Sequence, residues 1–137
     1  MEKTILATEN VLKDFILAMN QWEVHYYTIL KENELINIDN EMKENLTQIF
    51  NKFCTIKDRK YGKPNNISVG NPPVYSPDEE FLKTEELKGN KVVIYTQQKT
   101  RVKYQFRYTL QYKNEEWRID KKEVYNKSED KWEKYIL

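Results

Sequence analysis

Two residues in the first half of the chain have side chains suited to catalysis, and the pattern around each favours a structural role. His25 is the only histidine and Cys54 is the only cysteine. On a helical wheel His25 falls on the polar side of an amphipathic segment, which predicts a solvated histidine rather than a catalytic base. A nucleophilic cysteine needs a neighbouring base to form its thiolate. Cys54 follows Phe53 at the end of a second amphipathic segment, which predicts a small buried side chain instead.

Glu23 lies on the apolar side of the first amphipathic segment, where an isolated carboxylate is costly. One interpretation is a general base that faces an enclosed cavity, with a pKa raised by desolvation. The other is a structural carboxylate, buried in the core and paired with an arginine, a lysine or tyrosine hydroxyls from the sheet or the loop 57–61. Because no second acid/base group follows at a recognisable spacing, the sequence favours the structural role.

Sites for nucleotides, metals and nucleic acids are not indicated. The three glycines, Gly62, Gly70 and Gly89, are too widely spaced for a phosphate-binding loop. One histidine and one cysteine cannot supply the ligands of a zinc site. Aromatic and charged residues alternate along 101–112, which places them on opposite faces of a strand, whereas nucleic-acid stacking needs both together. We therefore expect no metal, no cofactor and no direct nucleic-acid binding.

The composition predicts one folded domain over residues 1–137. An apolar share of 39%, with 13% aromatic residues, is sufficient for one packed core. The net charge is only +1, but four lysines accompany nine acidic residues over 1–50, and nine basic residues accompany four acidic ones over 91–125. This separation gives a partner one negative and one positive surface. A single cysteine and the lack of a signal-like or membrane-spanning apolar stretch predict a cytoplasmic protein without membrane contact.

Apolar periodicity predicts two helices over about 8–54. The first extends from Thr8, a suitable N-cap, to about Glu32. Its apolar stripe consists of Leu12, Ile16, Met19, Tyr26, Tyr27 and Leu30. The second begins near Asp39, its expected cap, and has apolar residues at i, i+4, i+7, i+8 and i+11 from Met42. All four prolines follow within an expected loop over 55–77, which could include one short strand at 67–69.

Residues from about 78 to 137 predict an antiparallel sheet. Gly89 separates strands 81–87 and 92–98 in a hairpin, and the alternation over 102–112 predicts a strand with one buried face. A turn at 114–115 then leads into a strand over 117–125. This turn sets the expected pairs as Tyr112 with Trp117, Gln111 with Arg118, Leu110 with Ile119, and Thr109 with Asp120. Helices followed by hairpins predict an α+β layer in which the long first helix packs across the sheet.

Six short segments over nearly the whole chain carry a family pattern. They are FILAM at 15–19, WE at 22–23, FNKFCTIKDR at 50–59, PPVY at 72–75, YTLQY at 108–112 and WRID at 117–120. Together they resemble the bacterial immunity proteins with a nuclear transport factor 2-like fold, which occur in polymorphic toxin systems. The resemblance implies a cone, in which a strongly curved antiparallel sheet wraps around the long helix. It also implies a non-enzymatic protein that binds and neutralises a cognate toxin.

Two other functions stay open, because the same cone hosts isomerases, dehydratases and adaptor proteins. One is small-ligand binding or isomerase/dehydratase-like catalysis inside the cone, for which Glu23 with Tyr26 or Tyr27 would supply polar groups. The other is a scaffold that forms a homodimer through its outer sheet face. That face would carry Lys103, Gln105, Arg107, Gln111 and Arg118.

A nuclease toxin would present a positive face to nucleic acid, which predicts an acidic surface on its inhibitor. Two acidic clusters are available. The first, near the junction of the two helices, consists of Glu32, Glu34, Asp39, Glu41 and Glu44. The second, near the first hairpin, consists of Asp78, Glu79, Glu80, Glu85 and Glu86. Aromatic residues beside the second cluster are of the kind that dominate interface energetics. The sequence therefore predicts a toxin-binding site at Tyr75, Asp78, Glu79, Glu80 and Phe81.

Overall fold

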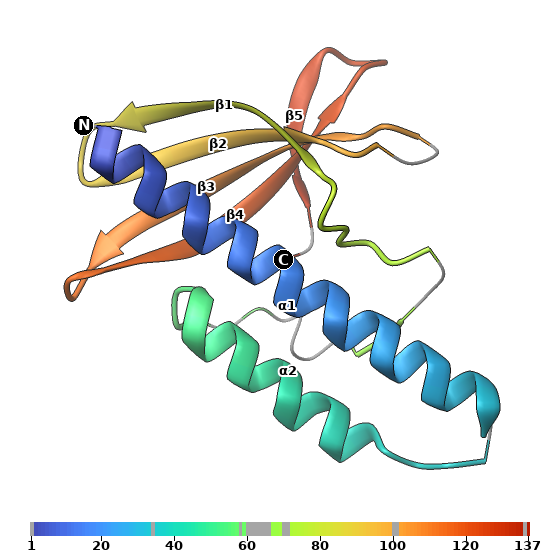
Figure 1. Ribbon diagram of the computed structural model, residues 1–137. Helices are drawn as coiled ribbons and strands as arrows, with labels where there is room; N and C mark the ends of the chain where they lie inside the picture. Colours follow the sequence, from blue (N-terminus) through green and yellow to red (C-terminus); the bar gives the residue numbers. More distant parts are fainter. Residues whose placement is uncertain are drawn as a thin grey trace.

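Two helices precede five strands in the computed structural model, which describes residues 2–33, 35–57, 59, 67–69, 72–99, 102–135 and 137. The elements are α1 (Glu2–Glu32), α2 (Asp39–Phe53), β1 (Glu80–Leu87), β2 (Lys91–Gln97), β3 (Gln105–Lys113), β4 (Glu116–Asn126) and β5 (Lys131–Tyr135). The strands form one antiparallel sheet in chain order. The first part of α1 crosses one face of this sheet, and its C-terminal part extends beyond the sheet beside α2 (Figure 1). This arrangement confirms the predicted α+β layer.

The two helices have the predicted apolar stripes but different starts. α1 already begins at Glu2, so Thr8 is not its N-cap. Thr8 is buried within the helix, and its hydroxyl donates a hydrogen bond to the carbonyl of Ile5 (2.8 Å). Asp39 is the first residue of α2 rather than its cap; Ile38 occupies the cap position without a side-chain hydrogen bond. The acidic Asp39 still lies in the first turn, where it complements the positive end of the helix dipole.

The first hairpin of the sheet forms as predicted, whereas the third strand starts later than predicted and the short strand at 67–69 does not form. The turn between β1 and β2 has positive φ at Gly89 (80°) and Asn90 (57°), the conformation that favours glycine and asparagine. β3 begins only at Gln105, because Lys103 has a positive φ (54°) that interrupts the extended backbone. Residues 67–69 form no strand. The chain ends on the core side of the sheet, where Leu137 is buried.

One extra residue in β4 changes the register of the β3–β4 hairpin. Three predicted pairs are confirmed, but Thr109 pairs with Lys121 instead of Asp120. Asp120 is thus the additional residue of a β-bulge, which reverses the side of the sheet to which the following residues point. Regular alternation after Ile119 would have turned Lys121 inward. The bulge leaves Lys121 exposed and turns Lys122 toward the core.

The loop after α2 holds the Asp120 bulge in place. The Asp120 carboxylate accepts hydrogen bonds from the hydroxyl of Thr55 (2.8 Å) and the ammonium of Lys57 (3.0 Å). Burial raises the pKa of Asp120, but these hydrogen bonds and the charges of Lys57 and Arg59 outweigh burial, and the net pKa is lowered. Arg59 in turn donates to the Thr55 carbonyl (2.7 Å) and hydroxyl (3.0 Å). The carboxylate is therefore ionised, and its Oδ1 atom is bound to this loop.

Arg118 joins the end of α2 to the same strand. Its guanidinium donates hydrogen bonds to the carbonyls of Asn51 (2.6 Å) and Cys54 (2.9 Å). Carbonyls at the C-terminal end of a helix have no N–H partner within the helix, and Arg118 supplies the missing donor. Cys54 forms a parallel bridge with Ile119, and burial raises the pKa of its thiol to about 12. As expected from the sequence, Cys54 is a buried thiol rather than a nucleophile.

The core lies between α1, α2 and the inner face of the sheet. Phe15 of α1 is at its centre, with edge-to-face contacts to Phe50 (centroid distance 5.7 Å), Phe53 (6.0 Å) and Tyr75 (5.5 Å). Between the two helices, the indole nitrogen of Trp22 donates a hydrogen bond to the carbonyl of Met42 (3.1 Å). These contacts join both helices and the loop before β1 into one apolar cluster.

Replacing Asp120 tests the bulge. We expect Asp120→Ala to lower the free energy of unfolding by about 1–3 kcal/mol, because it removes charge-assisted hydrogen bonds that hold the loop after α2. Urea denaturation monitored by circular dichroism measures this change. Glu129→Ala is the control, since its ion pair with Lys131 is exposed on both sides and contributes little. Equal effects of the two substitutions would contradict a structural role for Asp120.

Candidate functional site

The five residues of the predicted toxin-binding site differ in exposure to solvent. Asp78 and Glu80 are exposed, whereas Tyr75 and Glu79 are only 2% and 7% exposed. Both of these side chains are packed into the core, so Asp78 and Glu80 are the members of the predicted site that the unbound chain exposes. Phe81 is half-buried and packs against the core, with the Lys13 ammonium 5.2 Å from its ring centroid.

The segment 75–80 is bound to α1 at its start, and its last residue, Glu80, pairs with Gln97 of β2. Near its start, the Asn20 amide nitrogen donates to the Tyr75 carbonyl (2.8 Å), and the Tyr75 backbone N–H donates to the Glu23 carboxylate (3.4 Å). Toward its end, the N–H of Glu79 donates to the carbonyl of Ser76 (3.1 Å), which closes a turn. The segment therefore has a fixed conformation, in which Asp78 and Glu80 face solvent on either side of the buried Glu79.

Polar residues from five parts of the chain meet on the inner face of the sheet, and we call them the interior polar cluster. Its members are Glu23, Glu79, Thr96, Tyr108 and Lys122. Each is buried between α1 and the sheet or the loop before β1. Glu23, at 2% exposed, lies in the apolar stripe of α1 as the helical wheel indicates. One of its carboxylate oxygens accepts a hydrogen bond from the backbone N–H of Tyr75, in the loop before β1.

Lys122 is the centre of the cluster, and sequence reasoning missed it. The side chain is 1% exposed, and four aromatic rings surround its ammonium. The distances from Nζ to the ring centroids are 4.1 Å for Phe106, 4.3 Å for Tyr75, 5.1 Å for Tyr108 and 5.1 Å for Tyr135. Cation–π attraction to several rings compensates part of the lost hydration of a buried ammonium.

The apolar residues of β4 change from odd to even positions along the sequence, and this change is the signal of the bulge that turns Lys122 inward. The apolar residues at the start of β4 are Trp117 and Ile119, at odd positions, whereas the next aliphatic residue is Val124, at an even one. A strand with one buried face keeps a single parity unless a bulge intervenes. The shift between Ile119 and Val124 therefore indicates one extra residue between them, and the structure places this residue at Asp120.

Electrostatics couples Lys122 to the two buried carboxylates. Burial lowers the pKa of Lys122 to about 8, although the charges of Glu79 and Glu23 act in the opposite direction. Burial likewise raises the pKa of Glu79, against the opposing effects of the Lys122 charge and of the hydroxyls of Thr96 and Tyr108. Each charge is tolerated in the core because the other is present.

The ionisable groups of this cluster are enclosed rather than open to a substrate. A buried lysine with a lowered pKa is a candidate nucleophile or base wherever a substrate can reach it. Here the amine is enclosed by aromatic rings and has almost no exposed surface. Tyr26 does not join it, because its hydroxyl donates to Glu41 of α2 (3.0 Å) and accepts a hydrogen bond from Asn45. The Tyr26 hydroxyl is thus engaged with α2.

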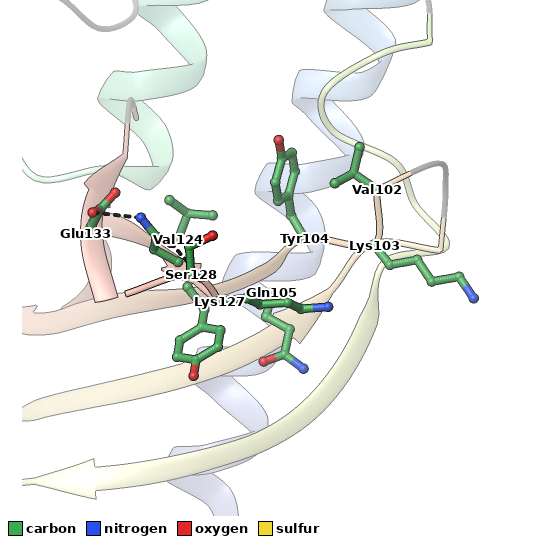
Figure 2. Close-up of a pocket in the computed structure, with 10 residues that line it drawn as sticks. Val102, Lys103, Tyr104, Gln105, Val124, Lys127, Ser128 and Glu133 are labelled. Carbon is green, nitrogen blue, oxygen red and sulfur yellow. Dashed lines mark hydrogen bonds between the residues drawn. The ribbon is translucent and has the colours of Figure 1, made fainter. Parts of the chain in front are cut away.

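A pocket of about 340 Å³ lies elsewhere, between the approach to β3 and the β4–β5 hairpin (Figure 2). In Figure 2, Val102 and Tyr104 point to one side, and Lys103 points away from them. The Asn126 amide donates to the Glu133 carboxylate (3.0 Å) at its border. The pocket is lined by neither Glu23 nor the tyrosines expected to accompany it.

The outer sheet face is also partly occupied by internal contacts. Arg107 forms a bidentate pair with Glu123 (2.9 and 3.0 Å), and its guanidinium lies 4.6 Å from the ring centroid of Trp132. Arg118 is engaged with α2, and Lys103 precedes β3. The residues expected to form a dimer interface therefore do not make one continuous strand surface.

Neither a metal site nor a membrane span is found in the part of the chain that the structure describes. No three histidine, cysteine or carboxylate side chains there are grouped so that they could hold a metal ion. Among the same residues, no helix combines the length and apolar character needed to cross a bilayer. His25 is exposed, as the wheel predicts, and its ring lies 4.8 Å from that of Tyr26.

The pH dependence of stability tests the burial of Lys122. Between about pH 8 and its ordinary pKa of 10.5, the unfolded chain keeps a proton on Lys122 that the folded chain has released. Raising the pH through this window therefore stabilises the folded state. Relative to Lys122→Met/Glu79→Gln, which lacks both charges, wild type should gain about 2–3 kcal/mol in free energy of unfolding between pH 7 and 10.

Urea denaturation of both proteins at several pH values measures this difference. Cys54 and the tyrosines titrate in both proteins, so their contributions cancel. A difference that stays constant from pH 7 to 10 would show that Lys122 keeps its ordinary pKa in the folded state.

Comparison with known proteins identifies the family of this chain. The chain is 50% identical over 129 residues to the protein named Immunity protein RhsIA of Dickeya dadantii (strain 3937), and the alignment covers 94% of this chain and 95% of the relative. No solved structure matches the chain significantly. The family described as NTF2 fold immunity protein matches residues 7–136, which is nearly the whole chain. The chain therefore belongs to the NTF2 fold immunity protein family.

Proposed function

We propose that this protein binds a cognate toxin protein and neutralises it, without catalysing a reaction of its own. The observation that carries the proposal is the 50% identity to an immunity protein over 94% of the chain. The interior polar cluster supports it, because the ionisable groups that could do chemistry are enclosed and matched to one another. An inhibitor needs a stable surface rather than an open cavity with convergent polar groups.

We place the toxin-binding surface at the exposed part of segment 78–81, with Asp78 and Glu80 as its charges and Phe81 as a half-buried apolar neighbour. The anchoring of Tyr75 and Glu79 holds this segment in one conformation before the toxin arrives. A preformed binding segment loses little conformational entropy on association, which favours affinity. Along β1, an edge strand of the sheet, Glu86 adds a further exposed carboxylate, whereas Glu85 forms an ion pair with Lys83 (3.1 Å).

The acidic surface fits a toxin with a positive face, and a nuclease is one class with that property. Complementary charges raise the association rate, which matters for an inhibitor that must capture a lethal enzyme quickly. The acidic cluster at the helix junction is the alternative surface. There Glu32, Asp39 and Glu44 are exposed, and Glu41 accepts a hydrogen bond from Tyr26. The remaining member, Glu34, lies outside the described residues.

We further propose that neutralisation takes place in the cytoplasm, where the nucleic-acid substrates of a nuclease toxin are found. The single cysteine supports this location, because no intrachain disulfide can form. Cys54 is buried as a thiol and needs no oxidising compartment for its structural role.

Co-expression tests the function directly. The toxin encoded beside the gene for this protein should arrest the growth of a host cell when produced alone. Production of this protein in the same cell should restore growth, and the two purified proteins should form a stable complex in size-exclusion chromatography. Unchanged growth arrest, with no complex between the folded proteins, would contradict the proposal.

Charge substitution tests the surface. We expect Asp78→Asn/Glu80→Lys to weaken toxin binding at least about 10-fold and to reduce its dependence on salt. Asn at position 78 can still accept the hydrogen bond that the Ser76 hydroxyl donates to Asp78. Asp39→Asn/Glu44→Lys makes the same change in formal charge on α2 and is the matched control. Isothermal titration calorimetry at two salt concentrations measures both. A loss of affinity confined to the α2 variant would move the site to the helix junction.

A further inference from the structure

Four buried polar atoms of the interior polar cluster lack a hydrogen-bond partner among the residues that the structure describes. They are Lys122 Nζ, a carboxylate oxygen of Glu79, the Thr96 hydroxyl and the Tyr108 hydroxyl. All four residues are less than 8% exposed. Buried polar groups in native proteins almost always have partners, so a group of four in one place indicates a partner that is not part of the chain.

The topology brings these four atoms to one place. Tyr108 of β3 is paired directly with Lys122 of β4, so that both side chains point to the inner face of the sheet. Thr96 of β2 is paired with Phe81, two residues after Glu79. The Thr96 and Tyr108 hydroxyls lie close enough to the Glu79 carboxylate to affect its titration, yet they form no hydrogen bond of good geometry.

Lys122 and Glu79 attract each other without touching. Their charges interact strongly enough to shift the pKa of each side chain. Within the described part of the chain, however, no direct ion pair joins Nζ to the carboxylate. Two polar groups that lie beyond hydrogen-bond distance are commonly bridged by a water molecule. The free-energy cost of immobilising this water is small compared with the cost of leaving two buried charges without hydrogen bonds.

We propose that water bound on the inner face of the sheet bridges Lys122 and Glu79 and completes the hydrogen bonding of Thr96 and Tyr108. The site offers donors from the ammonium and an acceptor in the carboxylate, with hydroxyls that can act as either. Water matches this set because each molecule both donates and accepts, and buried water typically has two to four polar partners. The surrounding aromatic rings enclose the site on the side of the ammonium.

This hydration explains how segment 75–80 is anchored. Glu79 is the last residue before β1, and its buried carboxylate has no direct protein partner of good geometry for one oxygen. Bound water would connect it to Lys122, and thereby to the β4 strand. The inference does not depend on any toxin, so it can fail while the proposed function holds, and the reverse is equally true.

Removal of each hydroxyl tests the proposal through the sign of its effect. Thr96→Val and Tyr108→Phe keep the shape of the side chain and delete only the hydroxyl. If water occupies the site, each variant removes one of its partners, and the urea midpoint should fall. If a hydroxyl has no partner at all, its removal relieves a desolvation penalty, and the midpoint should rise. Tyr112→Phe, at a 43% exposed tyrosine of the same strand as Tyr108, is the control and should leave the midpoint nearly unchanged.

A high-resolution crystal structure of the wild-type protein provides the direct observation. We expect at least one ordered water within hydrogen-bond distance of both Lys122 Nζ and the Glu79 carboxylate. Higher midpoints for both variants would overturn the proposal, as would a direct Lys122–Glu79 ion pair in the crystal. An organic molecule at this position, seen in the density and in native mass spectrometry, would overturn it as well and make the site a ligand site.

Discussion

The bulge at Asp120 is the constraint on which the interior of the molecule depends. Without this extra residue, β4 would turn Lys121 inward and Lys122 would face solvent. With it, Lys122 rather than Lys121 reaches the inner face of the sheet, where two carboxylates are buried. Glu23 holds the backbone of Tyr75, and Glu79 is buried at the entrance to β1. A single irregularity in one strand thus determines which of the two lysines, Lys121 or Lys122, lies beside the buried carboxylates.

Buried charges of this kind give a protein specificity more than stability. Desolvation of an ammonium and two carboxylates is costly, and a well-packed apolar cluster of the same volume would often be as stable. The charges nevertheless exclude alternative arrangements. A slip of β4 by one residue would expose Lys122 and turn Lys121 inward at a different place along the strand, while the apolar residues of the strand would also change faces. The polar cluster and the apolar pattern therefore select the same register.

The local features of this chain could be predicted from its sequence, and the non-local ones could not. The α1 stripe and the position of Glu23 in it follow from periodicity, and three pairs of the β3–β4 hairpin follow from the turn at 114–115. Burial of Tyr75 and Glu79 follows from a lysine more than forty residues later in the chain, and this lysine faces inward only because of the bulge. An acidic run such as 78–80 looks uniformly exposed unless its buried counter-charge is known. The start of α1 was misplaced for a similar reason, since Thr8 is a good cap that tertiary packing instead buries within the helix.

The same interior also explains how a cone can serve an inhibitor. A fold that encloses a helix within a curved sheet suits small-molecule chemistry when its inner face is open and its polar groups converge on a substrate. Here aromatic rings surround the inward ammonium of Lys122, and the loop before β1 contributes Tyr75 to that enclosure. The loop that covers the inner face is the one that continues into Asp78 and Glu80 on the surface. The contacts of the loop before β1 with the core therefore both cover the inner face of the sheet and fix the positions of Asp78 and Glu80. A protein that needs a rigid surface thus has a physical reason to keep charged residues in its core.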